Sequence, residues 1–167
     1  MDDFIAIGYH GSKDVLSKEK LDFNYKQYED HFLGRGFYIF RDSYNRAKEW
    51  VNNRHKGNEN KNIVYEIKIQ VGVDRMLNFT STNWGNELDV LELFLEICKK
   101  HNVHFGVFLD LLIDKFKVEI DAIAMIDLRN KSHFVPIVSE PHKTLFAFGD
   151  IQICIKTKKV IKKFKEC

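Results

Sequence analysis

The chain has 167 residues, of which 44% are hydrophobic and 13% aromatic, and it carries a formal net charge of +2 at pH 7. This composition excludes a disordered chain, and the length predicts a single domain, residues 1–167, with a core of its own. The net charge is too small to indicate nucleic-acid binding by itself.

The first half of the sequence predicts three strands and one helix. Residues 13–33, between the first two strands, are polar and are typical of a long loop with at most a short helix. Asp42 and Ser43 can cap a helix over about residues 44–54. The strands are expected at residues 4–10, 36–40 and 63–71.

The second half differs in character. Residues 86–101 carry leucines at helical spacing, and a second helix is expected over 105–116, so that a helical insert spans about residues 85–117. A short apolar strand at 121–127 follows, and residues 151–164 predict a last strand pair or one bent strand. Strands at both ends with helices between them favour an α+β fold over a doubly wound nucleotide-binding fold.

Two glycines flank an arginine immediately before the second predicted strand. Gly34 and Gly36 in "LGRGFYIF" have a structural interpretation, because glycine reaches positive φ and makes tight turns. They also have a functional interpretation, in which small residues let a ligand lie against the backbone while Tyr38 offers a ring face. The stretch alone leaves both open.

The end of the chain is rich in lysine. The stretch "KTKKVIKKFK", residues 156–165, contains six lysines in ten positions. Lysines of this kind protect an exposed sheet edge, and they also contact the phosphate backbone of a nucleic acid or another anionic partner. Both interpretations stay open.

The cysteines, the histidines and the N-terminus indicate which cellular compartment and which metal or membrane features to expect. The three cysteines have no paired spacing, which favours reduced thiols in the cytoplasm over a disulfide framework. The seven histidines are scattered without metal-ligand spacing, so no metal is expected. No signal peptide and no membrane segment is expected, since no long apolar run occurs.

Three short motifs occur in a fixed order along the chain. Tyr9-His10-Gly11-Ser12 follows the first strand, Gly34-Arg35-Gly36-Phe37-Tyr38 precedes a helix that contains Ala47, and Gln152 opens a late strand. They resemble the His-Tyr-Glu motifs of ADP-ribosyltransferases of the diphtheria-toxin and poly(ADP-ribose)-polymerase branch, most closely the small bacterial and phage-associated members. Residues 72–120 lie outside this resemblance. It implies an ADP-ribosyltransferase-like split antiparallel β-sheet core with a helical insert.

The resemblance implies that NAD binds as a co-substrate. His10 would hydrogen-bond the adenosine ribose 2′-hydroxyl, the Gly11 backbone would clamp the nicotinamide carboxamide, and Tyr38 would stack on the nicotinamide ring. Arg35 would either approach the pyrophosphate or stay solvated, and Trp50 would either close the other side of the ring or pack in the core. The implied NAD-binding residues are His10, Gly11, Ser12, Arg35, Gly36, Tyr38 and Trp50.

The third motif departs from the family pattern because Gln152 stands where the catalytic glutamate is expected. Glutamine keeps a hydrogen bond but lacks the negative charge and the capacity to act as a general base, so chain elongation is not expected. Asp150, two residues earlier on the strand, would point to the same side and supply the missing carboxylate, or else it is an exposed turn residue. Glu140 is a further candidate.

The resemblance implies a NAD-dependent mono-ADP-ribosyltransferase with His10, Tyr38, Gln152 and Asp150 as the candidate catalytic residues. Such a protein would be a toxin or defence effector that modifies an intracellular nucleic acid or protein, and it would be paired with an antitoxin or chaperone. A catalytically weak NAD- or ADP-ribose-binding module, or a NAD glycohydrolase, is the alternative. A third interpretation makes His10, Tyr38 and Gln152 hydrogen-bonded core residues of an interaction protein.

Overall fold

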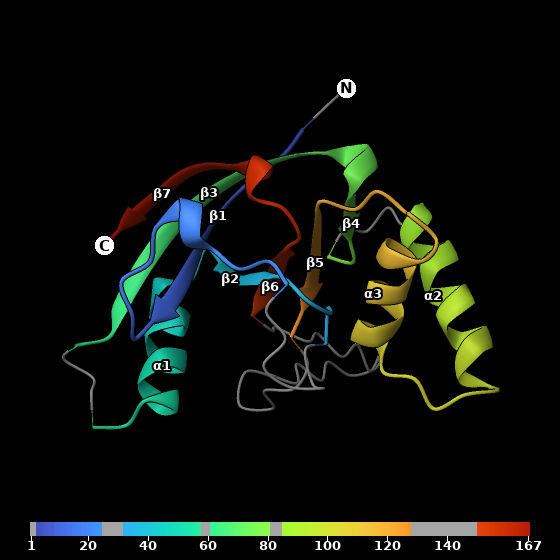
Figure 1. Ribbon diagram of the computed structural model, residues 1–167, viewed down its shortest axis with the longest axis horizontal. Coiled ribbons are helices and arrows are strands. Elements are labelled where there is room, and N and C mark those ends of the chain that lie inside the picture. Colours follow the sequence, from blue (N-terminus) through green and yellow to red (C-terminus); the bar gives the residue numbers. More distant parts are fainter. Residues whose placement is uncertain (1–2, 25–31, 58–60, 81–84, 128–149) are drawn as a thin grey trace, which may run out of the picture.

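A computed structural model of the chain describes residues 3–24, 32–57, 61–80, 85–127 and 150–167. Within these residues the chain forms an α+β fold in which a seven-stranded mixed sheet packs with three α-helices (Figure 1). The strands are β1 (Asp3–Ser12), β2 (Phe37–Arg41), β3 (Ile63–Gly72), β4 (Met76–Asn78), β5 (Ala122–Ile126), β6 (Ile151–Ile155) and β7 (Ile161–Glu166). The helices are α1 (Tyr44–Arg54), α2 (Asn86–Cys98) and α3 (Phe105–Asp114), and the short 3₁₀ turns are η1 (Lys18–Lys20), η3 (Val73–Arg75) and η5 (Lys158–Val160). The predicted α+β class is therefore confirmed.

The elements expected from the sequence are present within a few residues of their predicted ends. Helix α1 begins after Ser43, whose hydroxyl accepts the Arg46 backbone N–H at 3.3 Å, as expected of an N-cap. The helices α2 and α3 lie within the predicted insert. The last segment forms two strands that are not neighbours in the sheet: β6 lies between β5 and β2, whereas β7 pairs with β3 at the sheet edge. Turn η5 separates the two strands.

Strand β4 was not expected. It is three residues long and pairs in parallel with β5, with Met76 opposite Ala122. An ion pair supports this pairing, since Arg75 Nε lies 2.6 Å from the buried carboxylate of Asp121. The Asp121 N–H also donates to the Arg75 carbonyl at 2.8 Å. This strand therefore depends on residues distant in sequence, and no local sequence pattern predicts it.

The sheet order is β4-β5-β6-β2-β1-β3-β7. Strands β1 and β3 pair along their whole length, whereas β1 and β2 pair only at Gly8–Arg41 and Tyr9–Phe40. Two groups of strands, β7-β3-β1 and β2-β6-β5-β4, are therefore joined by a short central contact. This junction lies beside the candidate site.

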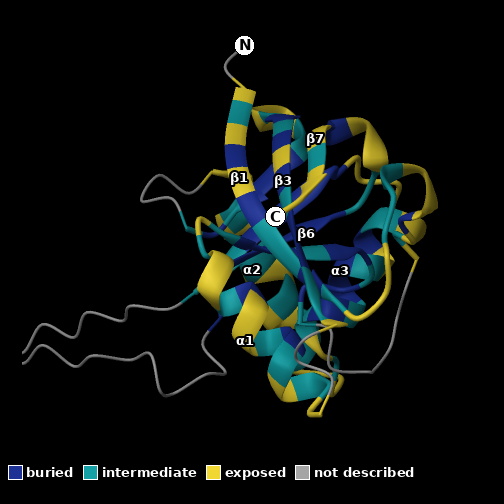
Figure 2. Cartoon of the chain, turned by 90° about the vertical axis from the view of Figure 1, so that its left-hand side faces the viewer, coloured by how far each residue is buried: buried dark blue, intermediate teal, exposed yellow. Residues whose placement is uncertain are grey.

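All three α-helices cover one face of the sheet, which we call the helix face (Figure 1). Phe40 packs with Ala47 of α1, and Tyr38, two residues earlier on the same strand, packs with Leu109 and its neighbours on α3. The opposite face carries the largest apolar cluster, which includes Ile39, Ile67 and Ile153. Figure 2 shows that exposed positions occur on β1 and β7 and on the outer sides of the helices, whereas the central strand β6 is largely buried.

Candidate functional site

The three sequence motifs lie on β1, β2 and β6, the three adjacent strands in the middle of the sheet. Tyr38 pairs with Cys154, and Phe40 pairs with both Gln152 and Tyr9. Paired residues of antiparallel strands project to the same face, so Tyr38 and Gln152 share the helix face. They are diagonal neighbours in this register, with Cα atoms roughly 7–8 Å apart.

His10 bridges the point where β1 and β2 separate. Its Nδ1 lies 2.8 Å from the backbone carbonyl oxygen of Tyr38. A carbonyl only accepts, so Nδ1 carries the proton and donates, and Nε2 is the acceptor nitrogen. Burial lowers the pKa of His10 from 6.5 to about 4, against the smaller opposing effect of this hydrogen bond. The imidazole is therefore neutral at neutral pH.

The His10 ring lies between aromatic residues that belong to the two faces. Its centroid is 4.4 Å from that of Phe37, in the cluster of the opposite face, and 6.5 Å from that of Trp50, which lies on α1 at the helix face. The imidazole thus occupies the gap between the two strands. Trp50 is a core-packing residue here, and the Arg54 guanidinium lies 4.9 Å from its ring centroid.

The Tyr38 side chain is anchored to the corner that precedes its own strand. Its hydroxyl donates to the Gly34 carbonyl oxygen at 2.6 Å and accepts the Leu33 N–H at 3.2 Å. Burial raises the pKa of the Tyr38 phenol well above its usual range, so the hydroxyl stays protonated. The ring orientation therefore depends on the shape of the corner at residues 33–36.

Both glycines of this corner are required by its structure. Gly34 has φ +75°, and a Cβ there would lie 2.3 Å from an Asp110 carboxylate oxygen. Gly36 has φ +154°, and a Cβ there would lie 2.5 Å from Cys154 Sγ. The structural interpretation of the two glycines is thus supported, and the corner is the support on which Tyr38 rests.

A buried lysine and an aspartate hold the same corner from outside. Lys156 Nζ donates to the carbonyl oxygens of Leu33 (2.7 Å) and Arg35 (2.6 Å), and its side chain is 8% exposed. Asp110 of α3 accepts the Arg35 N–H at 2.9 Å. The Arg35 guanidinium pairs with Asp110 and Asp114. Its side chain is 30% exposed, so the guanidinium is paired and also partly in contact with solvent.

Gln152 is buried, with 6% of its surface exposed, and its amide is hydrogen-bonded. Its Nε2 donates to Asp127 Oδ2 at 2.7 Å. Asp127 follows β5 directly and is also 6% exposed. Its backbone N–H donates to the Asp150 carbonyl oxygen at 2.8 Å, which aligns the end of β5 with the start of β6. The carboxylate beside Gln152 thus belongs to Asp127.

Asp150, the carboxylate expected to assist Gln152, contacts a cation. Its Oδ2 lies 2.6 Å from Arg46 Nε, and the two side chains are 18% and 14% exposed. Arg46 extends from α1 and places its Cζ 5.7 Å from the Phe40 ring centroid. The charge of Asp150 is therefore largely balanced by Arg46, which connects α1 to the start of β6.

The first motif contacts helix α1. A Cβ on Gly11 would lie 2.4 Å from the Ala47 carbonyl oxygen and 2.7 Å from Val51 Cβ, so the helix packs directly on this backbone. The Ser12 hydroxyl accepts the Asp14 N–H at 3.1 Å and closes the turn after β1. Glu140 lies outside the residues that the structure describes.

Three residues of this site were not singled out from the sequence. Asp127, Arg46 and Lys156 reach it through strand pairing or helix packing between segments far apart in the chain. The available signals were weak: an acid at the end of an apolar strand, and a lysine at the first position of a basic tract. Neither pattern specifies a partner.

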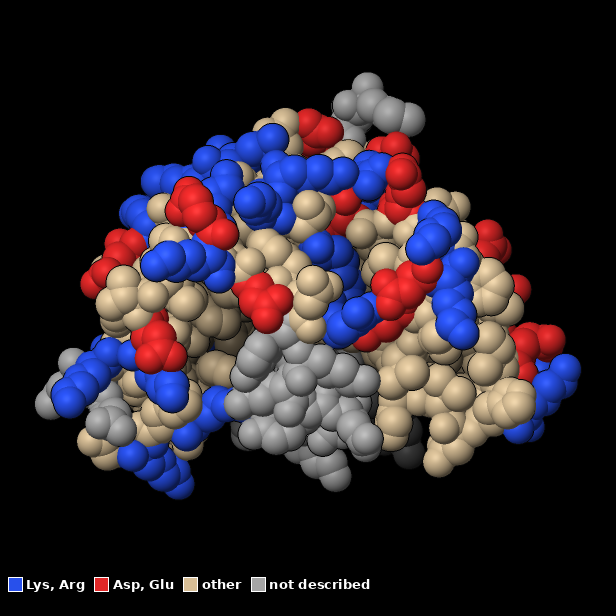
Figure 3. All heavy atoms as spheres, viewed as in Figure 1, with Lys and Arg blue, Asp and Glu red and all other residues tan. Residues whose placement is uncertain are grey.

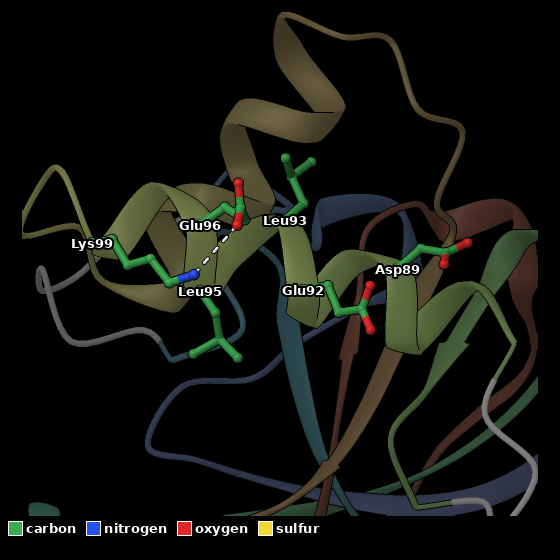
Figure 4. Close-up of a pocket in the computed structure, with 6 residues that line it drawn as sticks. All are labelled: Asp89, Glu92, Leu93, Leu95, Glu96 and Lys99. Atoms are coloured by element: carbon green, nitrogen blue, oxygen red, sulfur yellow. Dashed lines mark hydrogen bonds and ion pairs between the residues drawn. The ribbon is translucent and has the colours of Figure 1, made fainter.

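Other features of the described ranges lie apart from these motifs. A shallow hollow on α2 is lined by Asp89, Glu92, Leu93, Leu95, Glu96 and Lys99, and Lys99 and Glu96 form an ion pair within it (Figure 4). Among the described residues, no helix has the length and apolar character needed to cross a bilayer. The same residues contain no group of three or more histidine, cysteine or acidic side chains placed to bind a metal ion.

No family model, curated protein or solved structure matches this chain.

Proposed function

We propose that this chain is a NAD-dependent mono-ADP-ribosyltransferase with an ADP-ribosyltransferase-like split sheet and α2–α3 as its helical insert. One observation carries the proposal: residues of three separate motifs adjoin on β1, β2 and β6. His10 is hydrogen-bonded to the Tyr38 backbone, and Tyr38 and Gln152 are diagonal neighbours on paired strands. Residues that resemble the family motifs in order, with Gln152 in place of the glutamate, thus also lie on adjacent strands.

Each group has a part in the reaction. His10 Nε2 accepts a hydrogen bond from the adenosine ribose, which requires the neutral tautomer described above. The ring of Tyr38 stacks on nicotinamide, where an aromatic–base stack is worth about 1–3 kcal/mol. The Gln152 Oε1 accepts from a hydroxyl of the nicotinamide ribose. Together they hold NAD in the conformation from which the glycosidic bond breaks.

The reaction is a substitution at ribose C1′. The C1′–N bond breaks, and nicotinamide leaves as a neutral molecule with the bonding electron pair. An oxygen or nitrogen of the acceptor forms the new bond to C1′ and loses its proton to water. Because Gln152 is not a general base, the acceptor must be a good nucleophile on its own or be activated elsewhere, and a single transfer is expected.

The acceptor is proposed to be an intracellular nucleic acid or protein, as for a toxin or defence effector acting in the cytoplasm. Basic side chains gather over β7 and η5, along the upper edge in Figure 3. Some of them are paired within the chain, since Lys159 lies 3.2 Å from Asp121, and Lys163 and Lys165 both contact Glu66. This pairing favours edge protection by β7 over a dedicated phosphate-binding surface.

NAD binding by Tyr38 variants tests the proposal. Tyr38→Ala removes the stacking ring and should weaken NAD affinity at least tenfold by isothermal titration calorimetry. Tyr38→Phe keeps the ring but removes the corner contacts, so it should bind NAD more weakly than wild type and more tightly than the alanine variant. Tyr44→Ala, at an exposed tyrosine on α1, is the control. If the wild type and the three variants all fold and bind NAD with equal affinity, Tyr38 does not contact NAD.

A further inference from the structure

The hydrogen bond between Gln152 and Asp127 fixes which way the glutamine amide points. Asp127 in its ionised form only accepts hydrogen bonds, so it faces the amino group of Gln152 and never the amide oxygen. Both side chains are 6% exposed, so water competes little with this contact. The amide oxygen of Gln152 is consequently directed away from Asp127 as an acceptor.

The same contact places a negative charge next to position 152. Asp127 Oδ2 lies 2.7 Å from Gln152 Nε2, within the range of a charge-assisted hydrogen bond. In a buried setting such a charge acts on its surroundings more strongly than it would in water. Asp150 contacts Arg46 of α1 at 2.6 Å, whereas Asp127 contacts the Gln152 amide itself.

We propose that Asp127 is the positioning residue of the site: it orients the Gln152 amide, and its charge, through that amide, replaces the charge that a glutamate would carry at position 152. This inference rests on the proposed function. The pair divides between two side chains what a single glutamate does alone, with Gln152 as the acceptor for the ribose hydroxyl and Asp127 as the source of negative potential near the developing ribosyl cation.

The Asp127→Asn variant tests the orientation with almost no change in size. Asparagine both donates and accepts, so the Gln152 amide can turn over and present its amino group to the ribose. The kcat of nicotinamide release should fall about 10- to 100-fold, while KM for NAD should change far less, because the lost effect belongs to the transition state. Asp89→Asn, at an exposed acid of α2 that lies apart from the three motifs, is the matched control.

Exchange of the two side chains separates positioning from a merely structural role. Gln152→Glu alone places two carboxyl groups at hydrogen-bond distance, where repulsion prevents both from being ionised, so nicotinamide release should also fall. The double variant Asp127→Asn with Gln152→Glu restores an amide–carboxylate pair of the same size and net charge. Its rate of nicotinamide release should recover to within about threefold of wild type, since the donor and acceptor are simply exchanged.

The outcomes distinguish the inference from the function on which it rests. Loss in both single variants and recovery in the double variant, at similar melting temperatures, supports the positioning role. An active wild type with an unaffected Asp127→Asn variant overturns this inference alone. If nicotinamide release in every variant is simply proportional to the amount of folded protein, the inference is also overturned, since Asp127 would then have only a structural role. A wild type that neither binds NAD nor releases nicotinamide overturns the proposed function, and this inference with it.

Discussion

The neutral state of His10 makes the stability of the protein depend on pH. Its pKa is about 4 in the folded chain and 6.5 ordinarily, so between these values the unfolded chain binds more protons than the folded one. Its unfolding free energy should therefore fall as the pH drops from about 6.5 toward 4, by at most about 3 kcal/mol. Below pH 4 both states are protonated and this loss stops.

Denaturant unfolding at several pH values checks this behaviour. His10→Gln should remove most of the difference between pH 7 and about pH 4.5, because glutamine does not titrate. The exposed His101, replaced in the same way, is the control and should leave the difference unchanged. An identical pH dependence in the His10→Gln variant and the wild type would mean that His10 is not held neutral by burial.

The corner at residues 33–36 should tolerate no side chain at Gly34. Alanine there meets both a positive φ and an Asp110 oxygen, so Gly34→Ala should lower the unfolding free energy by about 2 kcal/mol or more. Gly57 is the matched control, since its φ is +85° and a Cβ there meets nothing within 4 Å. Gly57→Ala should cost only about 1 kcal/mol, the strain of the backbone alone. Equal losses by chemical denaturation would show that the packing contacts of Gly34 are unimportant.

The sequence singled out candidate residues of the proposed site, but it did not predict their contact partners. His10, Tyr38 and Gln152 stand out because each interrupts or ends an apolar strand beside a recognisable motif. Asp127 does not, because its contact with Gln152 depends on the antiparallel pairing of β5 with β6, which are separated by more than twenty residues. Asp150 was the expected carboxylate, but the packing of α1 brings Arg46 to it.

At the scale of elements, the residue that follows β6 holds the corner before β2. Lys156 follows β6 and donates to two carbonyl oxygens of the corner. Lys156→Met keeps much of the length of the side chain but leaves these buried acceptors without their donor. The unfolding free energy should fall by about 2–4 kcal/mol, and NAD affinity should fall with it because the corner supports Tyr38.

The neighbouring Lys158 supplies the control for this variant. Its side chain is exposed, so Lys158→Met should change stability by no more than about 0.5 kcal/mol. If Lys156→Met and Lys158→Met had the same effect on thermal unfolding, the buried contacts of Lys156 would contribute nothing. Lys156 also differs from Lys158 within the lysine-rich stretch, because its side chain is buried whereas Lys158 is exposed.

Elements with strong local patterns were predicted, and those that depend on distant partners were not. Helix α1 has a capping residue and an apolar side, and β3 alternates apolar with more polar residues. Both elements could therefore be predicted from the sequence. Strand β4 has three residues and exists because β5, more than forty residues later, pairs with it. The place of β7 at the sheet edge also depends on pairing, in this case with β3.

At the scale of the whole molecule, the proposed site lies where the two groups of strands meet. Strands β1 and β2 share only two residue pairs there, and His10 supplies a side-chain hydrogen bond beyond them. This junction is flanked by α1 on one side and by α3, through the corner, on the other. The α+β class followed from the order of elements in the sequence, whereas the short junction required knowledge of strand register.

The most direct test of the account is to incubate the purified chain with adenylate-labelled NAD and a mixed cell lysate. Released nicotinamide and label in nuclease- and protease-treated fractions are then measured. We expect nicotinamide release together with label on a macromolecule, lost with nuclease for a nucleic-acid acceptor or with protease for a protein, and both strongly reduced in Tyr38→Ala. Release without label would reduce the activity to NAD hydrolysis. Neither release nor label from a folded wild-type chain would contradict the account.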